Sequence, residues 1–199
     1  MEQPILSSRL FFFSLAFGIL VLFISTLGKI FSTKTNIALC NNEGSMTVYI
    51  RLNNKHDILI NPKSLKSALS CVGRYMPFYD RTIEFLLADF KKKPIIDEIK
   101  SRYNITNITS STNVNFKMLG NISYDKQYVE YKEANESYLI LLKEISPFDL
   151  NKRLTSKNYS LVFMPKYSEK YGELVESIKK EKIQIALNNN YVYFVNPTL

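Results

Sequence analysis

One uncharged apolar stretch constrains the fold of this chain more than any other feature. The stretch Leu10–Gly28 reads LFFFSLAFGILVLFISTLG, and its 19 residues include no charged side chain. A helix rises about 1.5 Å per residue, so the stretch matches a hydrocarbon core of roughly 30 Å. The hydroxyl groups of Ser14, Ser25 and Thr26 can hydrogen-bond to the preceding helical turn. The sequence therefore predicts a transmembrane helix over residues 10–28, in contact with membrane lipid.

A cleaved signal peptide is the alternative interpretation of this stretch. It requires a shorter apolar core, with small residues one and three positions before the cut. Thr26 and Gly28 come closest to that pattern, but a cut there falls inside the apolar run. We therefore expect a retained anchor, preceded by a short tail at residues 1–9.

The residues that flank the stretch bear on its orientation. Arg9 precedes it while Lys29 and Lys34 follow it, which slightly favours a cytoplasmic domain by charge counting. Cys40 and Cys71 are the only cysteines, and an even count suits one disulfide in an oxidising compartment. A short tail before a long domain is also typical of an uncleaved export signal. We expect the domain on the non-cytoplasmic side. Five Asn-x-Ser/Thr triplets add only weak support, and they begin at Asn104, Asn107, Asn121, Asn135 and Asn158.

Composition predicts one folded domain at residues 36–199, joined to the anchor by a linker at residues 29–35. The chain is 46% hydrophobic and 22% charged, which excludes a disordered tail. Its formal net charge is +8, which favours an anionic partner such as a lipid surface. No motif supports nucleic-acid binding, so we expect no nucleic acid partner. Two lysine clusters at predicted helix ends are candidate contacts with an anionic surface: Lys91, Lys92, Lys93, Lys179, Lys180 and Lys182.

Hydrophobic periodicity predicts an α/β or α+β domain in which helices pack on one face of a mixed sheet. In the first half we expect a hairpin of strands 37–40 and 46–52, then a strand at 57–60. Helices are predicted over residues 62–72, 80–90 and 94–103. The helix at 80–90 follows from the apolar residues Ile83, Leu86, Leu87 and Phe90, which lie on one helical face.

The second half is predicted to contain fewer helices. Residues 104–125 are expected to form a long loop with one edge strand, and residues 124–136 fit either a helix or a strand. Strands are expected at 138–142 and 159–164, with a short helix from Ser146 between them and another helix from Ser168. Residues 183–187 and 191–195 are expected to pair as a final hairpin. The sequence shows no internal repeat.

Candidate catalytic and metal-binding groups are few. His56 is the only histidine, so Cys40, Cys71 and His56 form the one conceivable three-ligand set, and their spacing fits no zinc motif. We expect no metal and no cofactor. Ser177 and Lys180 match a Ser-x-x-Lys pattern, but near the end of a predicted helix, where a serine nucleophile does not belong.

The leading hypothesis is a non-catalytic, single-pass membrane subunit of a multiprotein cell-envelope assembly, of secretion or transport type. Its domain would bind other subunits of the membrane complex. One alternative is a membrane-anchored enzyme that acts on lipid or cell-surface carbohydrate through the carboxylates Asp57, Asp80, Glu84 or Asp149. Another is a basic module that binds anionic lipid or polymer.

Overall fold

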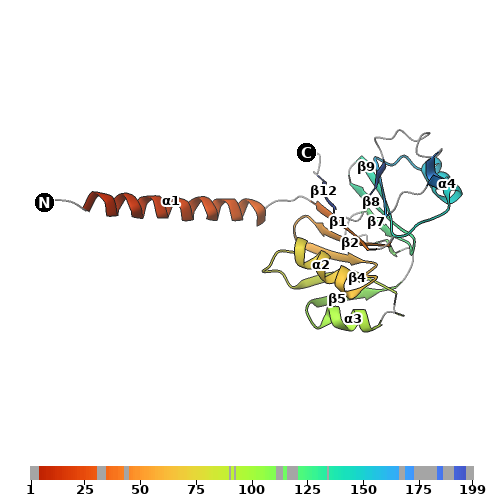
Figure 1. Ribbon diagram of the computed structural model, residues 1–199, viewed down its shortest axis with the longest axis horizontal. Coiled ribbons are helices and arrows are strands. Elements are labelled where there is room, and N and C mark those ends of the chain that lie inside the picture. Colours follow the sequence, from red (N-terminus) through yellow and green to blue (C-terminus); the bar gives the residue numbers. More distant parts are fainter. Residues whose placement is uncertain are drawn as a thin grey trace. The chain divides into compact units, whose positions relative to one another are not determined.

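The computed structural model divides the chain into two compact units, Met1–Thr33 and Lys34–Leu199. Figure 1 shows their secondary structure. The structure describes residues 5–30, 35–42, 45–89, 91, 93–110, 114–115, 121–133, 135–165, 169–172, 183–185 and 191–195.

The first unit contains one helix, α1 (Ile5–Ile30). The side chains described in it are those of residues 11–24, and all of them are exposed. The Ser14 hydroxyl donates to the carbonyl oxygen of Phe11 at 2.9 Å, the internal pairing that the sequence predicts. Within the described residues, no helix meets the length and hydropathy of a membrane span.

The second unit is built on two mixed sheets. Sheet A has the strand order β12-β1-β2-β3-β4-β5. Its strands are β1 (Thr35–Asn42), β2 (Ser45–Leu52), β3 (His56–Ile60), β4 (Thr82–Leu87), β5 (Asn104–Thr109) and β12 (Tyr191–Val195). The pairs β12-β1, β1-β2 and β2-β3 are antiparallel, whereas β3-β4 and β4-β5 are parallel. Helices α2 (Leu65–Tyr75) and α3 (Lys93–Lys100) make the two parallel crossovers.

Sheet B has the strand order β11-β10-β9-β8-β7-β6. Its strands are β6 (Val114–Asn115), β7 (Asn121–Tyr124), β8 (Tyr128–Glu133), β9 (Glu136–Leu141), β10 (Leu161–Met164) and β11 (Ile183–Ile185). The first three pairs from β6 are antiparallel, and β9-β10 and β10-β11 are parallel. Helix α4 (Pro147–Ser156) connects β9 to β10, and η2 (Glu169–Tyr171) follows β10.

The apolar side chains form three clusters, which divide the unit into layers. A central cluster joins inward residues of sheet A, such as Ile50 and Ile58, to inward residues of sheet B, such as Tyr131 and Tyr138. A second cluster lies between the outer face of sheet A and helices α2 and α3. A third lies between the outer face of sheet B and α4. The two sheets therefore pack face to face, with helices on their outer faces.

The two sheets repeat one topology, although no repeat is evident in the sequence. Residues 35–109 run as three antiparallel strands, a helix, a parallel strand, a helix and a last parallel strand. Residues 121–185 follow the same order, with the second crossover described only at residues 169–172. The ladder Ile37, Ile50, Ile58, Phe85 corresponds to the ladder Ile122, Tyr131, Tyr138, Leu161. The expectation of a single mixed sheet was wrong, because the strands form two.

Several predicted elements are confirmed and others are wrong. The hairpin β1-β2, the strand β3, and helices near 62–72, 94–103 and 147–156 are all present. The predicted helix 80–90 is instead the strand β4, buried between the α2–α3 layer and sheet B. A strand covered on both faces carries apolar residues without strict alternation, which imitates a helical face.

The predicted final hairpin is also wrong. β11 pairs with β10 in sheet B, while β12 pairs with β1 in sheet A. The sequence did not reveal that there are two sheets, so the neighbouring segments 183–187 and 191–195 were predicted to pair with each other. Residues 104–125, predicted as a loop with one edge strand, contain β5, β6 and β7. The predicted helix from Ser168 lies mostly outside the described residues.

Candidate functional site

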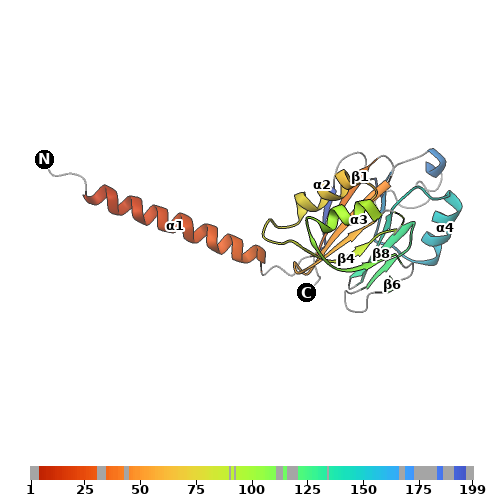
Figure 2. The same cartoon turned by 90° about the horizontal axis from the view of Figure 1, so that it is seen from below.

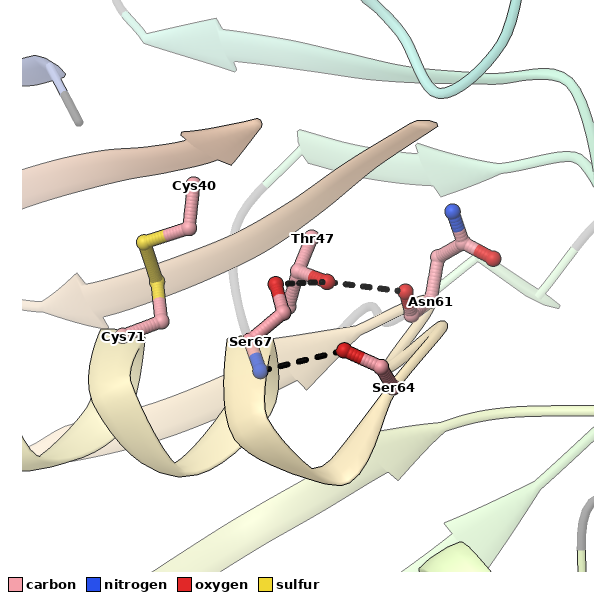
Figure 3. The surroundings of a disulfide bond; sticks show 6 residues. All are labelled: Cys40, Thr47, Asn61, Ser64, Ser67 and Cys71. Carbon is pink, nitrogen blue, oxygen red and sulfur yellow. Dashed lines mark hydrogen bonds between the residues drawn. A yellow bond between two sulfur atoms is a disulfide. The ribbon is translucent and has the colours of Figure 1, made fainter. Parts of the chain in front are cut away.

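The two cysteines are joined in a disulfide between β1 and α2 (Figure 3). The Cys40 and Cys71 Cα atoms lie 5.9 Å apart, and both side chains are buried. The bond therefore fixes the middle of α2 to the outer face of sheet A.

Hydrogen bonds fix the first turn of α2 to the same sheet. Ser64 caps the helix, because its hydroxyl accepts from the Ser67 N–H at 3.1 Å. The Ser67 hydroxyl donates to the Thr47 hydroxyl, which donates to the carbonyl oxygen of Asn61 (Figure 3). Asn61 has a φ of 54°, a left-handed conformation that few side chains adopt. The side-chain amide of Asn61 donates to the Met46 carbonyl oxygen at 2.8 Å, which holds this turn in place.

A buried charged network lies on the outer face of sheet A, around Arg51. Its Nη1 donates to Asp57 at 2.6 Å and to Asp80 at 2.9 Å. Its Nε and Nη2 donate to the side chain and carbonyl of Asn54, both at 3.0 Å. The Tyr49 hydroxyl donates to Asp57 at 2.6 Å. Arg51 is 3% exposed and Asp57 is fully buried, so the guanidinium charge is neutralised within the protein.

Burial controls the protonation of this network. It raises the pKa of Asp57 to about 7, against the hydrogen bond from Tyr49 and the charge of Arg51. Burial and the charge of Asp57 also raise the pKa of Tyr49, so its phenol stays protonated and donates. Partial burial opposes ionisation of Asp80, but the Thr82 N–H and Arg51 bind its carboxylate and keep its pKa below the usual value.

The structure brings together three of the four carboxylates that the enzyme hypothesis names. Asp57 and Asp80 share Arg51, and Glu84 accepts from the Asp57 backbone N–H at 2.6 Å. Asp149 lies elsewhere, at the start of α4, where it binds the capping hydroxyl of Ser146. The carboxylates of Asp57 and Asp80 are thus occupied by donors within the protein, an arrangement that suits a structural role.

The equivalent place in the second repeat is an open cavity of about 470 Å³. By ladder register, Glu130, Lys132 and Ser137 replace Tyr49, Arg51 and Asp57, and all three line it. Glu130 binds Lys157 at 2.5 Å and the Tyr159 hydroxyl at 2.6 Å. Burial and the hydrogen bond to Glu130 raise the pKa of Tyr159. In the first repeat this position is filled by the ion pairs of Arg51 with Asp57 and Asp80. In the second repeat the equivalent position is an open cavity.

A smaller cavity of about 240 Å³ lies where the two repeats meet. Its walls combine residues that follow strands of both sheets, and three of them are lysines. Near this corner the Met46 N–H donates to the Leu142 carbonyl oxygen at 2.9 Å and links the sheets. The residues that line the cavity are Asn61, Pro62, Lys63, Asp89, Ser110, Tyr124, Lys126 and Lys143.

The candidate surface lysines are described only in part. Lys91 and Lys93 are exposed. Lys91 precedes α3 and Lys93 is its first residue, so their predicted place at a helix C-terminus was wrong, because the segment before them is a strand. Lys92, Lys179, Lys180 and Lys182 lie outside the described residues, as does Ser177.

His56 is exposed at the start of β3, while its neighbour Asp57 points into the network. Among the described residues, no group of three histidine, cysteine, aspartate or glutamate side chains is placed to hold a metal ion.

The sequence did not reveal the Arg51 network, because the predicted strand at 46–52 does not show which residues Tyr49 and Arg51 meet across the neighbouring strands. An arginine six residues before an aspartate, across the turn Asn53–Asn54, was the available signal. Comparisons give no further guide, since no protein-family model, curated protein or solved structure matches this chain.

Proposed function

We propose that this protein is a non-catalytic, single-pass membrane subunit of a cell-envelope assembly. In this proposal residues 10–28 anchor it in the bilayer, and its domain lies outside the cytoplasm and binds other subunits. The observation that carries the proposal is an exposed apolar helix joined to a disulfide-bonded domain.

The side chains of α1 support the anchor. Eleven large apolar side chains between Phe11 and Ile24 are 48% to 74% exposed. Soluble monomers rarely expose contiguous apolar surface beyond a few hundred Å², because each Å² of apolar surface in water costs about 25 cal/mol. The acyl chains of a bilayer would cover the apolar surface of α1, and so would the transmembrane helix of a partner protein.

The disulfide supports a non-cytoplasmic domain. Disulfides persist in oxidising compartments and are rare in the cytosol, where thiols are kept reduced. A membrane-impermeant thiol reagent tests this sidedness in intact cells, because Cys40 and Cys71 are the only cysteines and become thiols on reduction. We expect labelling only after a reductant and a denaturant are added from outside. Labelling that requires permeabilised cells would place the domain in the cytoplasm.

The Arg51 network supports a non-catalytic role for the first repeat. The carboxylates of Asp57 and Asp80 already accept hydrogen bonds from Arg51, and the two cavities described above are lined by other residues. A carboxylate that works as an acid, base or nucleophile must reach substrate. We therefore favour the subunit over the membrane-anchored enzyme.

Native extraction in mild detergent, followed by mass spectrometry of co-purified proteins, tests the subunit proposal. We expect a defined set of membrane proteins at fixed ratios. Recovery of the chain as a lone monomer, from membranes in which it is expressed at its natural level, would contradict the proposal.

A further inference from the structure

An exposed aromatic pair lies in the loop between α2 and β4. Phe78 is 89% exposed and Tyr79 is 57% exposed. Their rings meet edge to face, with centroids 5.5 Å apart. In the described part of the domain, the other exposed large apolar side chain is Phe148, on α4. Among the described residues of the domain, the pair and Phe148 are therefore the large apolar side chains that are exposed.

The loop that carries the pair is held firmly. The Asp80 N–H donates to the Pro77 carbonyl oxygen at 2.9 Å and closes the turn. The Asp80 carboxylate then accepts from the Thr82 N–H at 3.1 Å and from Arg51 at 2.9 Å. Because the turn is already ordered, little conformational entropy remains to be lost when the two rings bind something. The Arg51 network thus positions Phe78 and Tyr79.

Strand directions place this loop at the edge of sheet A where the domain begins. β1 and β3 start at this edge, and β2 ends there, as the antiparallel pairs Asn36–Arg51 and Leu52–His56 show. β4 runs parallel to β3, so its start at Thr82 lies at the same edge. Figures 1 and 2 agree, since the yellow loop after α2 emerges at the end of the sheet where β1 starts.

The linker keeps this edge close to the bilayer, if residues 10–28 span it as proposed above. Residues 29–34 separate Gly28 from the first strand residue, Thr35, and α1 continues through the first two of them. Six residues would reach about 20 Å even if all were extended, so this is an upper bound on the distance. Lys91 and Lys93, by contrast, follow the end of β4 and lie at the opposite edge of the sheet.

Exposed cations also lie at this edge of sheet A. Helices α2 and α3 end there, and so do the turns that precede β3, β4 and β5. Arg102 is paired with Glu98 at 3.2 Å, and Arg51 is paired with Asp57 and Asp80. Asp97, in the last turn of α3, is an exposed carboxylate at this edge. The exposed cations outside these pairs outnumber it, and they are Lys55, Arg74, Arg81 and Lys100.

We infer that this edge, defined by Phe78, Tyr79, Lys55 and Arg81 and called here the aromatic edge, docks onto the headgroup region of an anionic bilayer. Tyrosine is enriched at membrane interfaces, and Lys and Arg are attracted to an anionic lipid surface. Phe78 adds exposed apolar surface beside Tyr79, which the boundary between headgroups and acyl chains can cover. The inference rests on the proposed anchor.

The chain has no tryptophan, so Phe78→Trp gives a single fluorescent reporter at the site. The full-length variant is reconstituted in vesicles of phosphatidylcholine with phosphatidylglycerol, and separately in phosphatidylcholine alone. In the anionic vesicles we expect a blue-shifted emission that brominated lipid quenches, and we expect added salt to reverse both effects. Phe148→Trp is the matched control, and its emission should remain that of an indole in water.

Flotation of the same vesicles separates the two proposals. If the chain does not float with lipid after alkaline extraction, the anchor proposal fails. If the chain floats but the reporter at position 78 keeps a water-like emission in anionic vesicles, only the docking inference is overturned. Quenching that is equal in neutral and anionic vesicles would also overturn it, because the cations would then have no part. Lys55→Gln with Arg81→Gln should weaken the quenching, whereas Lys91→Gln with Lys93→Gln should leave it unchanged.

Discussion

At the scale of single residues, Arg51 is the centre of the first repeat. Its guanidinium lies in a buried site and donates to two carboxylates and to Asn54. Taking such an ion out of water is costly, and only a nearly complete set of hydrogen bonds offsets that cost. The arrangement fixes β2, β3 and the loop before β4 relative to one another.

Replacing Arg51 should therefore destabilise the domain strongly. Arg51→Met keeps much of the side-chain volume but leaves Asp57 and Asp80 without a cation. We expect the free energy of unfolding to fall by about 3 kcal/mol. Urea unfolding of the full chain in detergent micelles, followed by tyrosine fluorescence, measures it. Lys93→Met is the control on an exposed lysine, and a similar loss in both variants would refute a special role for Arg51.

Asp57 should give the stability a distinctive pH dependence. Burial raises the pKa of this carboxyl to about 7 in the folded protein, whereas an unfolded aspartate titrates near 4. Between these values the folded state holds the extra proton, so stability falls as pH rises, by at most about 1.4 kcal/mol per pH unit. We expect a larger free energy of unfolding at about pH 5 than at about pH 8. For Asp57→Asn, the urea midpoint should not fall in this way as pH rises. If it falls as steeply as in the wild-type protein, another group causes the pH dependence.

Residues differ in how far the sequence predicts their roles. The pairing of Cys40 with Cys71 was predictable because only one partner exists for each. The Arg51 network was not, because its members become neighbours only through strand register and through a loop that follows α2. The sequence shows that Phe78 and Tyr79 are aromatic, but it does not predict that they are exposed, because exposure depends on how the loop packs.

At the scale of elements, helix α2 is fixed to sheet A at two places. Its first turn is held by Ser64, Ser67 and Thr47, and its middle by the disulfide. Removing the disulfide with Cys40→Ser and Cys71→Ser frees a loop of 31 residues in the unfolded state. We expect a loss of about 3 to 4 kcal/mol in the free energy of unfolding.

The reduced wild-type protein is the natural comparison for this double variant. Both should unfold at the same urea concentration, below that of the oxidised protein. If the serine variant is much less stable than the reduced protein, the hydroxyl groups in the apolar outer cluster, and not the loss of the bond, would explain the change.

Element type was predictable where the residue pattern alternates or a helix start is marked, and unpredictable where apolar residues run together. In β2 the apolar residues Met46, Val48 and Ile50 alternate with Thr47, Tyr49 and Arg51, although both faces of the strand are buried. The start of α4 is marked by Ser146 and Pro147. β4 was mistaken for a helix because Ile83, Leu86 and Leu87 are all buried, some toward the α2–α3 layer and others toward sheet B. Periodicity reports a single buried face, and this strand has two.

At the scale of the whole domain, the duplicated topology is the main organising feature. Each repeat has one sheet face covered by helices and one left bare, and the bare faces cover each other. The repeat is hidden in the sequence because equivalent positions hold different residues, such as Arg51 with Lys132 and Ile58 with Tyr138. One hydrogen bond is common to both repeats. The Asp57 N–H donates to the Glu84 side chain in the first, and the Ser137 N–H donates to the Ser160 side chain at the equivalent position in the second.

Because the bare faces need each other, the two repeats should fold as one unit. Ile50 is fully buried in the central cluster with residues of both sheets. Ile50→Ala should lower the free energy of unfolding by about 2 to 5 kcal/mol. In native-state hydrogen exchange, the best-protected amides of β3 and of β9 should lose that same amount, although β9 belongs to the other repeat. Leu150→Ala, in the outer cluster of the second repeat, provides the reciprocal control and should lower protection in β3 equally. If either substitution affects only its own repeat, the halves fold independently and the central cluster is a docking interface between two finished domains.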